Sequence, residues 1–214
     1  MVAGVLAAAG VYLGVETDFL EAREGENADG FREHFGFNAL NERLLEHLGA
    51  GWDPPRMAEN WEARGDLEPF REEAVLLADR MGRSAGPGGH WGWKDPRSSI
   101  TIPFWRSLLP DAKVVVCVRD PADVAASQRK RNNLSRAAAG RLWLAYYGSL
   151  LAHVPEFRRV VTHYEAYFEN FDRAVERLCA GLGIPLDETK CARARACVKP
   201  ALRHNREAGL SAGA

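Results

Sequence analysis

Residues 113–127, KVVVCVRDPADVAAS, decide the fold class of this chain. The apolar run at 114–118 has the length and the β-branched residues of a strand that is buried on both faces of a sheet. Arg119 ends this run, and Asp120 and Pro121 then supply the N-cap and the first-turn residue of a helix. The stretch therefore predicts a strand that carries an arginine at its carboxyl end, beside the start of a helix.

This end of the predicted strand has the properties of a phosphate site. In α/β proteins ligands bind at the carboxyl edge of the sheet, and both helix N-termini and arginine side chains favour phosphate. Ser127 lies about two helical turns further on, so we expect its hydroxyl to join Arg119 on one anion. In the alternative interpretation, Arg119 and Asp120 cap the helix and pair with each other on a solvated surface.

Composition and charge indicate an ordinary globular protein. The 214 residues suffice for one domain with a sizeable core, and we expect a single domain over 1–214. The formal net charge of −1 argues against a protein that binds nucleic acid through its overall charge. The four cysteines lack C-x-x-C spacing, so neither a zinc site nor a disulfide framework is predicted. The apolar start lacks a charged leader and is too short for a bilayer, so we expect a cytoplasmic protein without a membrane partner.

The order of the predicted elements is typical of an α/β fold. Strands are predicted at 90–93, 113–118 and 159–164, and helices at 2–13, 36–48, 68–82, through 104–109, and at 121–131, 136–152, 168–182 and 187–197. Polar residues follow each strand, with KDPR at 94–97, RD at 119–120 and YE at 164–165. Because the carboxyl ends of parallel strands meet at one edge, we expect these groups to lie together, which favours the phosphate site over simple capping.

The segment RDPADVAAS at 119–127 resembles a motif of the sulfotransferase family that uses 3′-phosphoadenosine 5′-phosphosulfate (PAPS), particularly of its bacterial members. The resemblance implies that Arg119 and Ser127 hold the 3′-phosphate of PAPS. The segment KDPR at 94–97 is similar to the lysine-bearing strand end of the family, which implies that Lys94 lies near the transferred sulfuryl group.

Two further positions resemble this family. Tyr164, in the YE pair at 164–165, corresponds to a tyrosine that lies near the adenine, and Arg203 belongs to a basic tail segment that closes over the cofactor in similar enzymes. The resemblance implies a three-layer, P-loop-NTPase-like parallel sheet flanked by helices. It also implies that the chain needs no metal site.

One part of the family pattern is missing. In the family, a strand and a loop resembling G-x-x-R-S-G-T-S precede the first helix, and the N–H groups of this loop cradle the 5′-phosphosulfate. Here Met1 begins inside that helix, and no such loop follows later in the chain. We therefore expect a truncated or late-started version of a longer enzyme that lacks its first strand. The alternative is a naturally shortened homologue without catalysis.

Sulfuryl transfer needs a cation to stabilise the transferred group and a base to take the acceptor proton. Lys94 is the candidate cation. Glu33 is the first candidate for the base because some family members resemble it in carrying a glutamate there, and His34 and Asp95 remain rivals. The structural alternatives are a helix-start carboxylate for Glu33 and a surface ion pair for Lys94 with Asp95.

The resemblance implies that the chain transfers a sulfuryl group from PAPS to a hydroxyl of a carbohydrate or a small metabolite. One alternative is a catalytically inactive module of the same fold that binds adenosine 3′,5′-bisphosphate (PAP) or another nucleotide. Another is a P-loop kinase whose Walker loop is absent from this chain. The sequence indicates neither the identity of the acceptor nor the oligomeric state.

Overall fold

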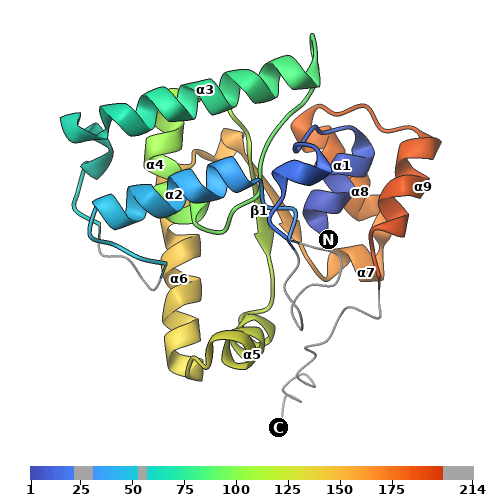
Figure 1. Ribbon diagram of the computed structural model, residues 1–214. Helices are drawn as coiled ribbons and strands as arrows, with labels where there is room; N and C mark the ends of the chain where they lie inside the picture. Colours follow the sequence, from blue (N-terminus) through green and yellow to red (C-terminus); the bar gives the residue numbers. More distant parts are fainter. Residues whose placement is uncertain (22–30, 53–56, 200–214) are drawn as a thin grey trace, which may run out of the picture.

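The computed structural model describes residues 1–21, 31–52 and 57–199 (Figure 1). The elements in these ranges are α1 (Val2–Ala9), α2 (Phe35–His47), α3 (Glu68–Ala85), α4 (Ser98–Leu108), β1 (Val114–Val118), α5 (Pro121–Asn132), α6 (Arg136–His153), β2 (Arg159–His163), α7 (Ala166–Glu169), α8 (Phe171–Leu182) and α9 (Glu188–Ala196). None of the helices in these ranges is both long enough and apolar enough to cross a membrane.

The two strands form a parallel sheet, with Val114 opposite Arg159 and Val118 opposite His163. The crossover between them consists of α5 and α6. A parallel pair needs a connection of this length, because its strands must run in the same direction. The predicted α/β class, with a parallel sheet flanked by helices, is therefore confirmed.

Helices cover both faces of β1. Successive side chains of a strand point to opposite faces, so Val115 and Val116 pack into different cores. On one face, Val116 packs with Ile102 of α4 and Leu150 of α6. On the other face, Val115 packs against a core to which α1, α8 and α9 contribute. Figure 1 shows α4 and α6 on one side of the strand and α1, α8 and α9 on the other.

The burial predicted for β1 is only partly correct. Val116 is 2% exposed, whereas the other four residues of the strand are half-buried. Among the described residues the only strand that pairs with β1 is β2, so one edge of β1 has no strand beside it. Two carbonyls at its end accept hydrogen bonds from α6 instead: Cys117 O, in the strand, from the Tyr147 hydroxyl at 2.6 Å, and Arg119 O, just after it, from Trp143 Nε1 at 3.4 Å.

The prediction of a strand at 90–93 is wrong. The described residues there form only an isolated parallel bridge between Tyr12 and Trp91. The Tyr12 N–H donates to the carbonyl of His90 at 2.8 Å, and the Tyr12 carbonyl accepts from Gly92 at 3.0 Å. Gly10 and Gly14, with φ of 107° and 117°, bracket Tyr12 and end the extended conformation on both sides. Too few residues remain for a ladder.

Two predicted helices differ from the observed ones in ways that local residues explain. The first ends at Ala9 rather than at residue 13, because Gly10 adopts a left-handed conformation and the N–H groups at 10 and 11 bond back to Ala7 and Leu6. The predicted helix at 168–182 is two helices, α7 and α8. Asn170 separates them, and its side chain caps α8 by accepting from the N–H of Arg173 at 3.2 Å.

A second core joins α2, α3 and α4. Phe37 of α2 stacks on Trp93 with the ring centres 4.4 Å apart, and Trp105 of α4 lies 4.7 Å from the Trp93 ring. Leu40 and Leu44 complete the buried stripe of α2. This aromatic packing fixes the segment before residue 94 against α2 and α4, and so sets the position of the polar residues that follow.

Candidate functional site

Local sequence signals determine how β1 leads into α5. Asp120 is the N-cap of α5, and its Oδ1 accepts from the N–H of Ala122 at 2.7 Å. Pro121 occupies the first turn, where its missing N–H costs no helical hydrogen bond. Arg119 therefore lies between the end of the strand and the positive end of a helix dipole, as the sequence predicted.

The Arg119 side chain is 24% exposed and is held by contacts with two other side chains. Its Nη2 lies 3.6 Å from Asp123 Oδ2, one turn into α5, and its guanidinium carbon lies 4.8 Å from the centre of the Tyr164 ring. Its Nε is buried and finds no hydrogen-bond partner among the described residues. The ion-pair partner of Arg119 is thus Asp123 rather than Asp120, and one donor of the guanidinium remains unsatisfied.

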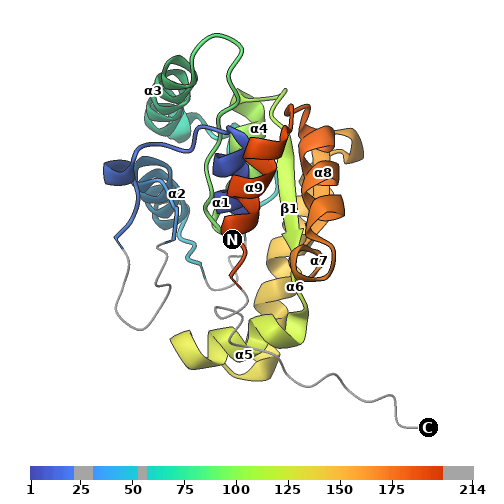
Figure 2. The same ribbon diagram turned by 90° about the vertical axis from the view of Figure 1, so that its right-hand side faces the viewer.

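The ends of β1 and β2 meet, as expected for parallel strands. The Tyr164 N–H donates to the carbonyl of Val118 at 2.8 Å, and the Asp120 N–H donates to Glu165 Oε1 at 3.5 Å. Figure 2 shows α5 and α7 at the end toward which β1 runs. Ser127 is half-buried on α5, four residues after Asp123 and so on the same helix face.

Lys94 and Glu33, which are 61 residues apart in the sequence, form an ion pair between Nζ and Oε1. The Glu33 side chain is 11% exposed and that of Lys94 is 41% exposed. The second carboxylate oxygen of Glu33 accepts from Asn38 Nδ2 at 3.1 Å. The structure thus brings together the two residues predicted to be catalytic, with the cation on the solvent side and the carboxylate beneath it.

Residues on both sides of Glu33 hold it in place. The Leu20 N–H donates to the Glu33 carbonyl at 2.9 Å, and Phe19 forms an antiparallel bridge with His34. His34 is the N-cap of α2, and its Nδ1 accepts from the N–H of Gly36 at 3.1 Å. The backbone of residue 33 is therefore fixed between a bridge and a helix start.

This capping role argues against His34 as the base. Its Nδ1 is already an acceptor, so the neutral ring carries its proton on Nε2. That Nε2 is buried, 4.0 Å from Asp18 Oδ2, and has no hydrogen-bond partner among the described residues. Burial also lowers the pKa of His34 below its ordinary value. The geometry favours Glu33 over His34.

Asp95 organises the turn that follows Lys94. Its Oδ1 accepts from the N–H of Arg97 at 2.9 Å, and its Oδ2 accepts from Asn41 Nδ2 at 2.8 Å. Burial raises the pKa of the Asp95 carboxyl. Both oxygens are engaged within the protein, and Lys94 pairs with Glu33 rather than with Asp95. The surface ion pair considered as an alternative for Lys94 and Asp95 is therefore not formed.

Sequence reasoning missed Asn38 and Asn41, two buried residues of α2 whose amides bond to Glu33 and Asp95. The available signal was a pair of amide side chains three residues apart beside the apolar stripe of one helix. Arg203 lies outside the described residues. No group of three or more metal-ligating side chains is present in the part of the chain that the structure describes.

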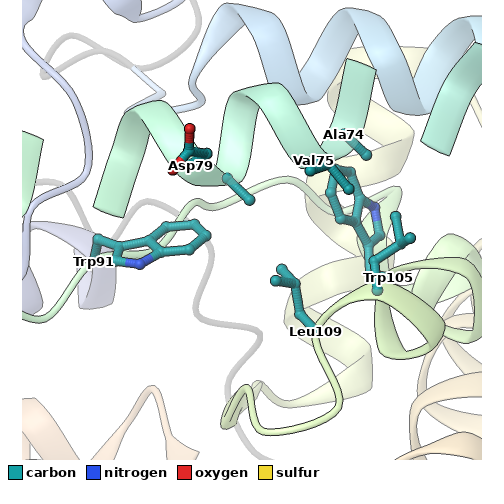
Figure 3. Close-up of a pocket in the computed structure, with 8 residues that line it drawn as sticks. Ala74, Val75, Asp79, Trp91, Trp105 and Leu109 are labelled. Atoms are coloured by element: carbon teal, nitrogen blue, oxygen red, sulfur yellow. The ribbon is translucent and has the colours of Figure 1, made fainter. Parts of the chain in front are cut away.

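A cavity of about 300 Å³ lies between α3 and α4 (Figure 3). The residues that line it are mostly apolar: Ala74, Val75, Ala78, Asp79, Trp91, Trp105, Leu108 and Leu109. Trp91 and Trp105 face the cavity from opposite sides. None of the predicted site residues lines it, so the cavity is separate from the Lys94–Glu33 and Arg119–Tyr164 pairs.

The model of a sulfotransferase family matches residues 17–188, a range that contains every predicted site residue except Arg203. Among solved structures, the chain is similar to the sulfotransferase domain from the curacin biosynthetic pathway, with 17% sequence identity and a TM-score of 0.45. The alignment covers 58% of this chain and 49% of that domain, so the chain spans about half its length. No curated protein matches the chain.

Proposed function

Because this chain belongs to the sulfotransferase family, we propose that it transfers a sulfuryl group from PAPS to a hydroxyl of a carbohydrate or small-metabolite acceptor. The observation that carries the proposal is the contact between the Lys94 ammonium and the Glu33 carboxylate. One group supplies positive charge and the other supplies a proton acceptor. Transfer of a charged group to a hydroxyl requires both.

In the proposed reaction, the acceptor oxygen attacks the sulfur in line with the leaving phosphate oxygen, and PAP departs as the S–O bond to it breaks. Lys94 turns from Glu33 and donates to the oxygens on which negative charge builds up. This movement frees Glu33 Oε1, which accepts the proton of the attacking hydroxyl. The 41% exposure of Lys94 supports its role as the partner that moves.

The proposed binding of PAPS, which supplies the sulfuryl group, rests mainly on Arg119. Its side chain is 24% exposed at the end of β1, and the planar, positively charged guanidinium group binds phosphate well, so this residue suits the 3′-phosphate. We assign the second contact of that phosphate to Ser127 on the same helix. Tyr164 stacks on Arg119 and is proposed to lie beside the adenine, and Arg203 is proposed to close over the cofactor.

We also propose that the α/β fold is of the three-layer, P-loop-like type with a parallel sheet. It is supported by helices on both faces of β1 and by the helical crossover from β1 to β2. In sheets of this kind, ligands bind beyond the carboxyl ends of the strands, where Arg119 and Tyr164 lie.

Calorimetric titration with PAP, followed by a transfer assay with labelled PAPS and a panel of hydroxyl acceptors, tests the proposal. We expect PAP to bind without Mg²⁺, and binding to be lost in Arg119→Ala. We expect Glu33→Gln and Lys94→Ala to bind PAP but to lose transfer, while Arg43→Ala on the outer face of α2 keeps both. Binding of PAP without transfer to any acceptor would indicate the inactive module. Binding of Mg-ATP in preference to PAP would indicate the kinase.

A further inference from the structure

Asn38 lies in the first turn of α2, where its side chain is almost fully buried. Its Nδ2 donates to Glu33 Oε2 at 3.1 Å, on the carboxylate oxygen that Lys94 does not contact. We propose that Asn38 is a positioning residue, which holds Glu33 so that Oε1 faces the acceptor hydroxyl during transfer. This inference rests on the proposed function of the Lys94–Glu33 pair.

The need for such a residue follows from the burial of Glu33. A carboxylate that is only 11% exposed requires polar partners, because leaving a buried charge without them is costly. In the proposed reaction Lys94 leaves Glu33 in order to reach the sulfuryl oxygens. Asn38 is then the partner that stays, since its short side chain is buried on a helix while the long Lys94 side chain is 41% exposed. One oxygen remains anchored and the other becomes free.

The two asparagines of α2 differ in a way that singles out Asn38. Asn41 is fully buried and makes four hydrogen bonds, to Asp95, Ser98, Thr101 and Trp105, so it joins α2 to the 95–105 region. The Asn38 amide makes a single side-chain hydrogen bond among the described residues, and that bond ends on Glu33. A buried amide whose single hydrogen bond ends on one carboxylate positions that carboxylate, and it does not connect different elements of the fold as Asn41 does.

The first test uses Asn38→Leu, which keeps the branching of the side chain at Cγ but removes the donor. We expect kcat to fall about tenfold or more while KM for PAPS and the affinity for PAP stay unchanged, because only the orientation of Glu33 is altered. Leu44→Val is the matched control, since it loosens the buried face of α2 without touching Glu33. A loss of kcat in Leu44→Val equal to that in Asn38→Leu would overturn the proposal. Asn38→Ala replaces the leucine variant if the latter does not fold.

The second test does not depend on activity. In protein labelled with ¹³C at the glutamate carboxyl groups, the Glu33 resonance is identified by its loss in Glu33→Gln. We expect Asn38→Leu to shift this resonance in the ligand-free protein and Leu44→Val to leave it in place. An unshifted resonance would overturn the positioning role. A shifted resonance in a protein without any transfer activity would support the contact and contradict the proposed function, so the two failures are distinguishable.

Discussion

The guanidinium of Arg119 lies over the ring of Tyr164, with its carbon 4.8 Å from the ring centre. The two residues follow β1 and β2, so this cation–π contact joins the carboxyl ends of the two strands. Stacking fixes the plane of the guanidinium, while its Nε remains without a partner among the described residues. The contact thus preorients a planar donor at the edge of the sheet where a phosphate is expected.

Arg119→Lys tests whether this planar geometry matters. Lysine keeps the charge but has neither the flat face that stacks on Tyr164 nor the paired donors that suit a phosphate. We expect the affinity for PAP to fall about tenfold, or about 1.4 kcal/mol, with a larger loss in Arg119→Ala. Calorimetric titration measures both values. Tyr164→Phe keeps the ring and is the control. Equal affinities for PAP in the wild type and in Arg119→Lys would contradict a planar contact with phosphate.

The structure of segment 113–127 could be predicted from its sequence because the signals that determine it are local. A β-branched run, an N-cap aspartate and a first-turn proline act over a few residues, and β1 and α5 formed where they indicated. The segment 90–93 is short and aromatic, and its pairing depended on Tyr12. The left-handed conformations of Gly10 and Gly14 limit that partner to one residue, and only the folded chain reveals this.

The candidate site shows the same division. Arg119 was found from the end of a strand, whereas Lys94 and Glu33 were identified as candidates through a family resemblance. Their ion pair joins residues 61 positions apart and was not predicted from the sequence. Asn38 and Asn41 were missed because hydrophobic periodicity marks the buried face of a helix but not the polar partners that a buried amide finds there. Such residues are identified once the carboxylates opposite them are known.

Asn41→Leu tests the largest polar network in the core. The substitution leaves four groups without their amide partner: the Asp95 carboxylate, the Ser98 and Thr101 hydroxyls and the Trp105 N–H. Because the Asp95 and Trp105 groups are buried, we expect the free energy of unfolding to fall by about 2–4 kcal/mol. Urea denaturation followed by circular dichroism measures this change.

Arg43→Ala is the control for that experiment. Arg43 lies on the same helix, two residues further on, and forms an exposed ion pair with Glu73 at 2.6 Å. We expect its removal to change the free energy of unfolding by less than about 1 kcal/mol, because exposed pairs contribute little. Similar losses for Asn41→Leu and Arg43→Ala would mean that the Asn41 network does not stabilise the core.

The N-cap His34 predicts a pH dependence of stability. Burial holds the pKa of His34 below its ordinary value of about 6.5, so the unfolded chain binds this proton more readily than the folded chain. The stabilisation from neutral His34 is therefore fully present above that value and is lost as the pH falls toward the lower pKa of the folded state. Protonation also removes the Nδ1 acceptor of the Gly36 N–H.

His34→Asn separates this contribution from those of other groups. Asparagine also caps helices but does not titrate, and carboxyl groups such as that of Asp95 are common to both proteins. We expect the free energy of unfolding to fall less between about pH 7.5 and about pH 5.5 in His34→Asn than in the wild type. Urea denaturation at intermediate pH values measures the difference. An identical pH dependence of the two proteins would rule out a contribution from His34.

For the Lys94–Glu33 pair, we expect removal of Lys94 to lower the free energy of unfolding more than removal of Glu33 does. Lys94→Met leaves the buried Glu33 carboxylate with only its bond from Asn38, and we expect a loss of about 1–3 kcal/mol in the free energy of unfolding. Glu33→Gln leaves an ammonium that is already 41% exposed and is readily hydrated, so we expect a loss below about 1 kcal/mol.

The double variant, which combines Lys94→Met with Glu33→Gln, completes a double-mutant cycle. Once Glu33 is neutral, removal of Lys94 no longer strands a charge, so the loss in the double variant should be smaller than the sum of the two single losses. Urea denaturation of the four proteins gives the coupling free energy. Additive losses, or equal losses from the two single variants, would contradict a buried carboxylate that depends on its cation. The expected larger loss for Lys94→Met would mean that Lys94 can leave Glu33 only when another group stabilises the carboxylate. Asn38 is the residue placed to do so.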